Sequence, residues 1–215
     1  MPLLDLLFPR VCACCDEHGR APLCRACERA APWIERACRR CALPRCPGCA
    51  GRGFTFDAAA SAGVYEGPVR DALIRFKVAG EHRVASALSR RMRAPARSLA
   101  LPGGVVATFV PSGAKALRER GRNPAELLAR PLALMLRVPV AALLVKQRET
   151  RDLAGLKRDE RRAALDGAFA ARRAPAHVLL VDDVLTTGAT ASACTAALKA
   201  AGASSVAVVT FARAL

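Results

Sequence analysis

Residues 178–190, Val-Leu-Leu-Val-Asp-Asp-Val-Leu-Thr-Thr-Gly-Ala-Thr, decide the fold of this chain. Val178 to Val181 form a short apolar run without polar alternation, which is typical of a buried strand in a parallel sheet. Asp182 and Asp183 follow at the predicted carboxyl end of that strand, where open α/β sheets bind their ligands. Small residues from Thr186 to Thr190 then lead into a helix and offer backbone N–H groups and hydroxyls to an anion. The segment therefore suits a sugar phosphate, with carboxylates for ribose hydroxyls and the turn for a 5′-phosphate.

Other phosphate-binding motifs do not explain this segment. The chain contains neither Gly-x-x-x-x-Gly-Lys-Ser/Thr nor Gly-x-Gly-x-x-Gly. The simplest alternative is an ordinary buried strand followed by a capped helix, with both aspartates merely solvated. Adjacent acids before a Thr-Thr-Gly turn exceed what helix capping requires, so the ligand-binding interpretation is favoured.

Eight cysteines near the N-terminus form four Cys-x-x-Cys pairs. Each pair can direct two thiolates to one metal ion, and two pairs complete a tetrahedral site, so the pattern predicts two structural zinc ions. We expect the first pair to combine with the second and the third with the fourth; a cross-braced pairing, disulfides and an iron–sulfur cluster are the alternatives. Disulfides are disfavoured because nothing marks the chain as secreted and cytosolic thiols stay reduced. The expected ligands are Cys12, Cys15, Cys24, Cys27, Cys38, Cys41, Cys46 and Cys49.

The chain of 215 residues is long enough for one α/β domain and a small metal-stabilised module. We place the module at 1–52 and the α/β domain at 53–215. Apolar periodicity in the module is too weak to specify a core, so metal would supply its folding energy. No apolar run has the length of a membrane span, and the first residues lack a basic lead and a cleavage site. We expect a cytoplasmic protein without membrane insertion.

Strands alternate with helices after residue 53, which predicts a parallel sheet flanked by helices. The expected strands are 57–65, 105–110, 140–145, 178–181 and 206–211. The expected helices are 69–77, 84–92, 125–136 and the one that follows the Thr-Thr-Gly turn. Pro95, Pro102 and the Gly103-Gly104 pair indicate a loop, and residues 146–162 indicate a mobile loop followed by a short helix.

The formal net charge of +16 invites a polyanionic partner. Arginine dominates the basic residues, a bias that a GC-rich genome also produces, so a solvated basic face is an equal alternative. Aromatic residues make up only 4% of the chain, so a bound nucleic acid would be contacted through its backbone with little sequence discrimination. The basic residues cluster as Arg36, Arg39, Arg40 and Arg45; Arg90, Arg91, Arg93 and Arg97; Arg118, Arg120 and Arg122; and Lys157, Arg158, Arg161 and Arg162.

Residues 178–190 resemble the phosphoribosyl pyrophosphate (PRPP) motif of type I phosphoribosyltransferases. With the cysteine pairs in front of this motif, nearly the whole chain resembles the ComF family. Its members join an N-terminal double zinc ribbon to a type I phosphoribosyltransferase-like domain, and several are linked to DNA uptake in natural transformation. Segments 3–9, 65–70, 73–77, 117–121, 159–162 and 167–169 add to the resemblance.

The resemblance implies roles for three sets of residues. PRPP, together with Mg²⁺, would be bound by Asp182, Asp183, Val184, Leu185, Thr186, Thr187, Gly188, Ala189 and Thr190, with the two aspartates as the catalytic pair. The pyrophosphate loop would be Pro111, Ser112 and Gly113. The hood loop, which could close over the leaving group, would contain Lys146, Arg148 and Arg151.

The loops depart from the family pattern. Phe109-Val-Pro-Ser-Gly113 stands where the family has a Val-Pro-Val-Pro-like strand end, and Arg122-Asn123-Pro124 stands where it has Phe-Asn-Gln. Leu153 and Ala164 stand at the positions of a Gln and an Asn in the hood region. PRPP binding is therefore a firmer expectation than turnover.

Three functions follow from the resemblance. The first is a PRPP-binding protein of DNA uptake that binds single-stranded or non-specific DNA and acts beside the competence helicase machinery. The second is an active phosphoribosyltransferase in nucleotide salvage or metabolism. The third is a regulator that senses PRPP without chemistry.

Overall fold

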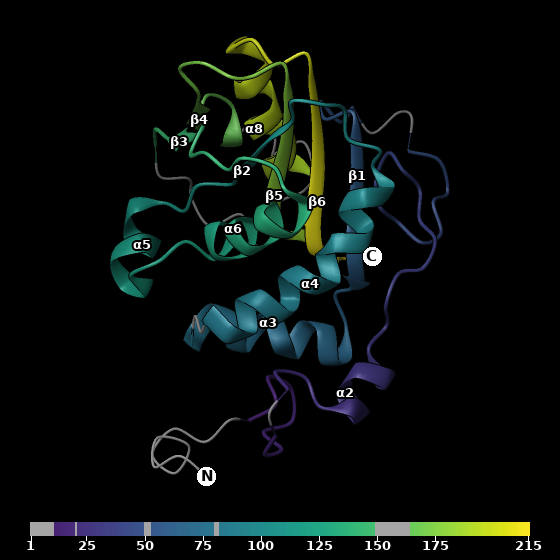
Figure 1. Cartoon of the computed structure of the whole chain (residues 1–215). Coiled ribbons are helices and arrows are strands. Elements are labelled where there is room, and N and C mark those ends of the chain that lie inside the picture. Colours follow the sequence, from purple (N-terminus) through teal and green to yellow (C-terminus); the bar gives the residue numbers. More distant parts are fainter. Residues whose placement is uncertain (1–10, 20, 50–52, 80–81, 149–163) are drawn as a thin grey trace.

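A four-stranded parallel sheet in the order β1-β6-β5-β2 forms the centre of the computed structural model (Figure 1). The structure describes residues 11–19, 21–49, 53–79, 82–148 and 164–215. The sheet contains β1 (Ala58–Val64), β2 (Val106–Phe109), β5 (His177–Leu185) and β6 (Ser205–Arg213), and a two-stranded sheet contains β3 (Val145–Lys146) and β4 (Phe169–Ala170). The helices are α2 (Arg25–Ala30), α3 (Gly67–Ala79), α4 (His82–Ser98), α5 (Ala114–Arg120), α6 (Pro124–Leu136) and α8 (Ala189–Ala200). The predicted parallel α/β sheet flanked by helices is confirmed.

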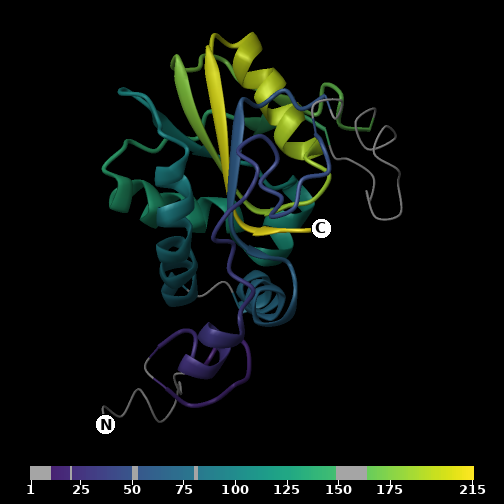
Figure 2. The same ribbon diagram turned by 90° about the vertical axis from the view of Figure 1, so that its right-hand side faces the viewer.

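The two central strands, β5 and β6, are buried because helices cover both faces of the sheet. Val178 to Val181 are almost completely inaccessible, as are Val206, Val208 and Phe211 of β6. Helices α4 and α6 lie on one face and α8 on the other, as Figure 2 shows. The continuous apolar run that indicated a parallel strand therefore reflects burial on both sides.

Residues 32–39 lie along the free edge of β1. The Ile34 amide donates to the Ala62 carbonyl at 2.9 Å, and the Val64 amide donates to the Pro32 carbonyl at 2.9 Å. Farther along, the Ala59 amide donates to the Arg39 carbonyl at 2.7 Å. This segment covers polar backbone groups that an edge strand would otherwise expose. The domain boundary after residue 52 stays a prediction.

Two sequence-based expectations about secondary structure are wrong. Pro95 lies inside α4 and not in a loop, because the buried Met92 and Ala96 hold one side of a helix that continues past it against the core. Residues 140–145 do not form a regular strand; Val140 makes a single bridge to Ala107, and only Val145 enters β3. The ladder ends there because the Leu143 amide donates within its own segment, to the Ala141 carbonyl at 3.1 Å, and to the Thr108 hydroxyl at 3.2 Å.

Several elements differ from or add to the prediction. Strand β5 continues four residues beyond Val181 and includes both aspartates. Helix α5 and the β3–β4 pair had no predicted counterpart. The predicted loop and short helix at 146–162 lie mostly outside the described residues. None of the helices in the described part of the chain combines the length and apolarity needed to cross a bilayer.

Candidate functional site

Residues 186–190, which connect β5 to α8 and form the first residues of α8, are the segment that the sequence analysis expects to bind a phosphate. We call it the phosphate turn. Gly188 has φ +80° and precedes the first residue of α8, a conformation that favours glycine. The Ala189 amide donates to the Thr187 hydroxyl at 3.3 Å. A Cβ atom on Gly188 would lie 2.6 Å from Cε1 of Phe54, so packing as well as backbone conformation requires glycine here.

The acid pair lies just before this turn and is only partly accessible. Asp183 Oδ2 accepts from Lys77 Nζ of α3 at 2.8 Å, and the Asp183 side chain is 16% exposed. Asp182 Oδ1 accepts from the Asp183 amide at 2.9 Å. Burial acts to lower the pKa of Lys77, but the Asp183 carboxylate outweighs it and raises that pKa. The structure thus adds a cation beside the acid pair, a partner that the sequence analysis did not predict.

Asp182 differs from its neighbour in protonation. Burial first, and the Asp183 charge second, raise the pKa of Asp182 to about 8, although the Asp183 amide and the Lys77 charge oppose the shift. Asp182 therefore retains its proton to a higher pH than an ordinary aspartate does. A divalent cation or a hydroxyl donor at this carboxyl would favour its release.

The loop 111–113 begins at the same edge of the sheet as the acid pair. The Val110 amide donates to the Val181 carbonyl at 3.1 Å, and β2 pairs in parallel with β5. The buried Asn123 fixes the start of this loop, because its Nδ2 donates to the Val110 carbonyl at 2.9 Å and its Oδ1 accepts from the Ala125 amide at 3.0 Å. Pro111, Ser112 and Gly113 are thus brought next to the strand that carries Asp182.

The hood residues are only partly described. Lys146 ends β3. Burial raises the pKa of the Cys194 thiol; the nearby Asp182 raises this pKa further, and the nearby Lys146 lowers it. Arg148 donates to the carbonyls of Ala164 and Asp166, so it is held by backbone in this structure. Arg151 lies outside the described residues, as does Leu153.

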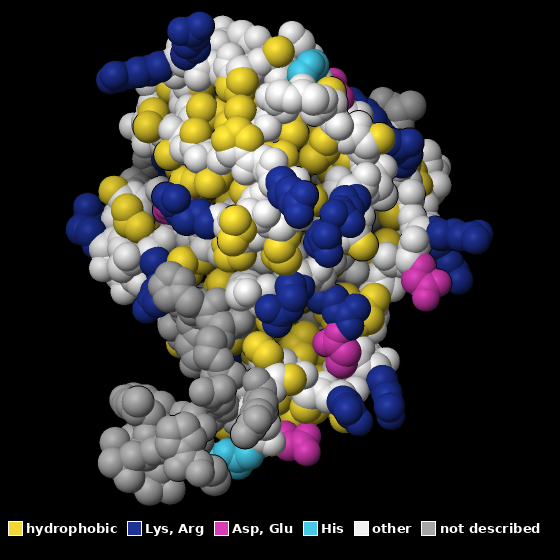
Figure 3. Space-filling view, in the orientation of Figure 1, with side chains coloured by type: hydrophobic (Ala, Val, Ile, Leu, Met, Phe, Trp, Pro, Cys, Tyr) yellow, Lys and Arg dark blue, Asp and Glu magenta, His cyan; other side chains and the backbone are white. Residues whose placement is uncertain are grey.

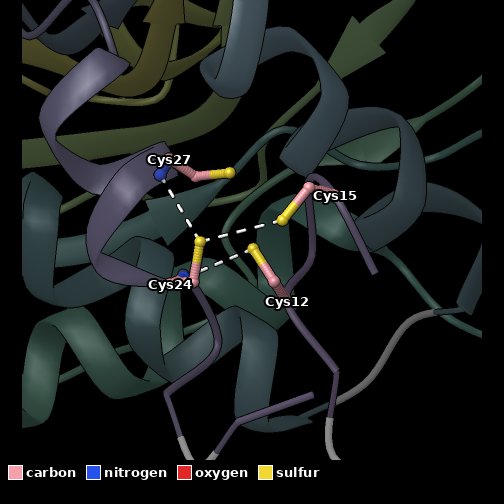
Figure 4. Close-up of side chains that lie close together, drawn as sticks. All are labelled: Cys12, Cys15, Cys24 and Cys27. Carbon is pink, nitrogen blue, oxygen red and sulfur yellow. Dashed lines mark hydrogen bonds between the residues drawn. The ribbon is translucent and has the colours of Figure 1, made fainter. Parts of the chain in front are cut away.

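Cys12, Cys15, Cys24 and Cys27 form the first four-cysteine group, with all four sulfur atoms within 4.8 Å of one another. Figure 4 shows the side chains converging from the segment 12–15 and from the start of α2. Cys15 Sγ and Cys24 Sγ are 3.7 Å apart, and the Cys24 sulfur accepts from the Cys27 amide at 3.5 Å. Cys14 is excluded from the group because its thiol donates to the Pro68 carbonyl at 3.1 Å.

Cys38, Cys41, Cys46 and Cys49 form the second four-cysteine group, again with sulfurs within 4.8 Å. The separation is 3.7 Å between the sulfurs of Cys38 and Cys49, and 3.5 Å between those of Cys41 and Cys46. The structure therefore gathers the cysteines in sequential pairs, and not in the cross-braced arrangement.

The sulfur geometry fits zinc. A tetrahedral ion with metal–sulfur bonds of about 2.3 Å has sulfur–sulfur edges of about 3.8 Å, whereas a disulfide needs about 2.05 Å. Burial would raise the pKa of Cys12, but amides of Cys24, Cys15 and Cys14 outweigh it and lower that pKa to about 6. In the second group, amides of Arg40 and Cys41 outweigh burial in the same way and lower the pKa of Cys38 to about 7. Both groups could bind zinc ions, consistent with a double zinc ribbon.

Two residues at the site were not assigned a role from the sequence. Lys77 reaches Asp183 from α3. Arg213, at the end of β6, is 2% exposed and donates to the carbonyls of Leu185 at 2.8 Å and Thr186 at 2.6 Å. Lys77 lies in segment 73–77, which resembles the ComF family, so this resemblance could have pointed to Lys77 as a site residue. No pattern in the sequence points to Arg213.

Positive charge is distributed over the surface and is not confined to the site. Figure 3 shows many Lys and Arg side chains and few Asp and Glu on the face that carries α4. Arg90, Arg93 and Arg97 are exposed on α4 and fall within a sector of about 60° at 100° per residue. Arg91 is used structurally, because it pairs with Glu28 and stacks on Trp33 at 4.6 Å. The predicted cluster at 157–162 lies outside the described residues.

No model of a known protein family matches the chain. A protein of Escherichia coli O157:H7, named DNA utilization protein YhgH, is 27% identical to it over 221 aligned residues. The alignment covers 94% of this chain and 96% of that protein, so the similarity extends over nearly the full length of both.

Proposed function

We propose that this chain is a ComF-type protein of DNA utilisation that binds PRPP with Mg²⁺ at the acid pair and the phosphate turn. One observation carries the proposal. The acid pair near the carboxyl end of β5, the phosphate turn after β5 and the loop 111–113 after β2 lie at one edge of the parallel sheet. The name of the E. coli relative supports the link to DNA.

In the proposed complex, different groups of the chain bind different parts of PRPP. The 5′-phosphate meets the backbone N–H groups at the start of α8 and the hydroxyls of Thr186, Thr187 and Thr190. The ribose hydroxyls donate to Asp182 and Asp183, and the latter is held in place by Lys77. Mg²⁺, when bound, would neutralise the pyrophosphate charge, and the Ser112 and Gly113 amides would contact the pyrophosphate.

Catalysis is the second candidate function. Displacement of pyrophosphate from C1 of PRPP by a nitrogen nucleophile develops positive charge at that carbon, so such a site acts mainly by positioning and charge stabilisation. The acid pair could stabilise that charge. In this structure Arg148 is bonded to two backbone carbonyls, so it would have to leave them to reach a leaving group.

Calorimetry tests the binding proposal directly. PRPP titrated into the protein in millimolar Mg²⁺ should bind, and Asp183→Asn should weaken binding about ten- to a hundredfold by removing a charge-assisted acceptor. Absence of binding to the wild-type protein would overturn the proposal. Release of pyrophosphate with any base in a panel would establish the transferase function in addition.

A further inference from the structure

A cavity of about 740 Å³ opens between the phosphate turn and the second four-cysteine group. Thr186 and Thr187 form one wall, and the segment between Cys41 and Cys49 forms the opposite wall. Figure 2 shows this segment against the sheet, close to the C-terminal end. A volume of this size is typical of sites for small ligands.

The position of the cavity relative to the acid pair is informative. Asp182 and Asp183 do not line it, whereas Thr186 and Thr187 do. If a phosphate occupies the turn and a ribose meets the aspartates, the cavity lies beyond the phosphate, on the side away from the ribose. PRPP has a terminal phosphate there and would leave the cavity free, but a phosphodiester would continue into it.

The walls suit a nucleotide. Leu43, Pro44, Pro47 and Val64 provide apolar surface. Arg45 is exposed at the rim, and among the described residues it forms no ion pair. Its guanidinium can meet a phosphate or stack on a base. A volume of about 740 Å³ gives room for one or two nucleotides.

We propose that the acid pair, the phosphate turn and this cavity together bind the 3′ end of a single strand of nucleic acid. The terminal nucleotide places its free 3′-hydroxyl on the acid pair, its 5′-phosphodiester lies in the phosphate turn, and the penultimate nucleotide occupies the cavity beside Arg45. The inference rests on the proposed function, because it uses the same phosphate and ribose subsites. It follows that PRPP and a strand end exclude each other.

The test uses hexathymidylate with either a 3′-hydroxyl or a 3′-phosphate, in Mg²⁺ and at about 0.2 M salt to suppress binding to the general basic surface. The 3′-hydroxyl strand should bind about tenfold more tightly, because a 3′-phosphate would face the acid pair. PRPP should displace it. A surface that responds to charge alone would bind both strands alike or favour the 3′-phosphate.

Variants distinguish the contribution of the cavity to strand binding from that of the phosphate turn. Arg45→Glu and Pro44→Glu change exposed side chains, and each should weaken the 3′-hydroxyl strand about tenfold while changing PRPP affinity less than about twofold. Arg36→Glu, at an exposed arginine of segment 32–39 that does not line the cavity, should leave the affinity for both ligands unchanged. Equal affinity for the two strands, or strand binding that PRPP does not displace, would overturn the inference alone. Failure of PRPP itself to bind would overturn the proposed function and this inference with it.

Discussion

Arg213 Nε donates to the Cys41 carbonyl oxygen across 2.8 Å. The same guanidinium donates to the carbonyls of Leu185 and Thr186, so one side chain joins the second four-cysteine group to the phosphate turn. Arg213 is 2% exposed, and a buried charge is costly unless its donors are satisfied. Hydrogen bonds of one side chain therefore fix the position of the second four-cysteine group relative to the phosphate turn.

Arg213→Lys should weaken this coupling. An ammonium keeps the charge but cannot span three carbonyls in the fork geometry of a guanidinium. We expect a lower melting temperature and PRPP affinity reduced by about tenfold, measured by thermal unfolding and calorimetry. Arg172→Lys, at an exposed position, is the control. Unchanged PRPP binding in Arg213→Lys would show that the turn keeps its shape without this side chain.

The two four-cysteine groups should respond differently to loss of a ligand. The wild-type protein should contain about two zinc ions per chain, and Cys24→Ser and Cys46→Ser should each release one. Only Cys46→Ser should also weaken PRPP binding, because its group contains Cys41, whose carbonyl bonds to Arg213. Elemental analysis and calorimetry measure both effects. Zinc-free protein with disulfides detected by mass spectrometry would contradict the metal assignment.

The raised pKa of Asp182 predicts a pH dependence with a definite sign. Between its ordinary value of 3.8 and about 8, the folded state holds a proton that the unfolded state has released, so stability falls as pH rises through this window. Asp182→Asn should remove this fall and have a higher melting temperature than the wild type at pH 8. PRPP affinity in saturating Mg²⁺ should rise from pH 7 to pH 9, because the carboxylate accepts more strongly than the acid. In Asp183→Asn the midpoint of that rise should move to lower pH.

Gly188→Ala should be destabilising for two separable reasons. The backbone at φ +80° costs an alanine roughly 1–2 kcal/mol, and the added Cβ would meet the Phe54 ring at 2.6 Å. Chemical denaturation should show the loss even without ligand. In the Phe54→Ala background the effect of Gly188→Ala should be smaller, because only the conformational part remains. An equal effect in both backgrounds would exclude the ring contact as a cause.

DNA binding in the absence of PRPP should depend on the arginines of α4. Reversal of Arg90, Arg93 and Arg97 to Glu should weaken binding of single-stranded DNA and reduce the slope of log affinity against log salt, by about 0.7 for each phosphate that is no longer neutralised. Reversal of Arg118, Arg120 and Arg122 makes the same change in charge on and just after α5 and is the matched comparison. Equal effects from both triple variants would assign the binding to overall charge.

The sequence predicted those features that depend on local pattern. The buried run 178–181 specified a parallel strand, and the Cys-x-x-Cys spacing specified which thiols could share a metal. The Lys77–Asp183 ion pair and the hydrogen bonds of Arg213 could not be predicted from the sequence, because they join positions far apart in the chain that only the packed fold brings together. Pro95 was misleading for a related reason, since the burial of its neighbours in α4 outweighs the local preference of proline for a helix end.

The pairing of β1 with β6 has a consequence for synthesis on the ribosome. Ser61 and Thr210, whose hydroxyls are 2.7 Å apart, are 149 positions apart in the chain, so β1 emerges long before its neighbour in the sheet exists. Segment 32–39 is synthesised before β1 and hydrogen-bonds to its edge. This segment contains Cys38 of the second four-cysteine group. Zinc captured early in translation would hold this segment in place and shield a nascent strand from wrong partners. Zinc supply during translation should therefore affect how much of the newly made protein folds.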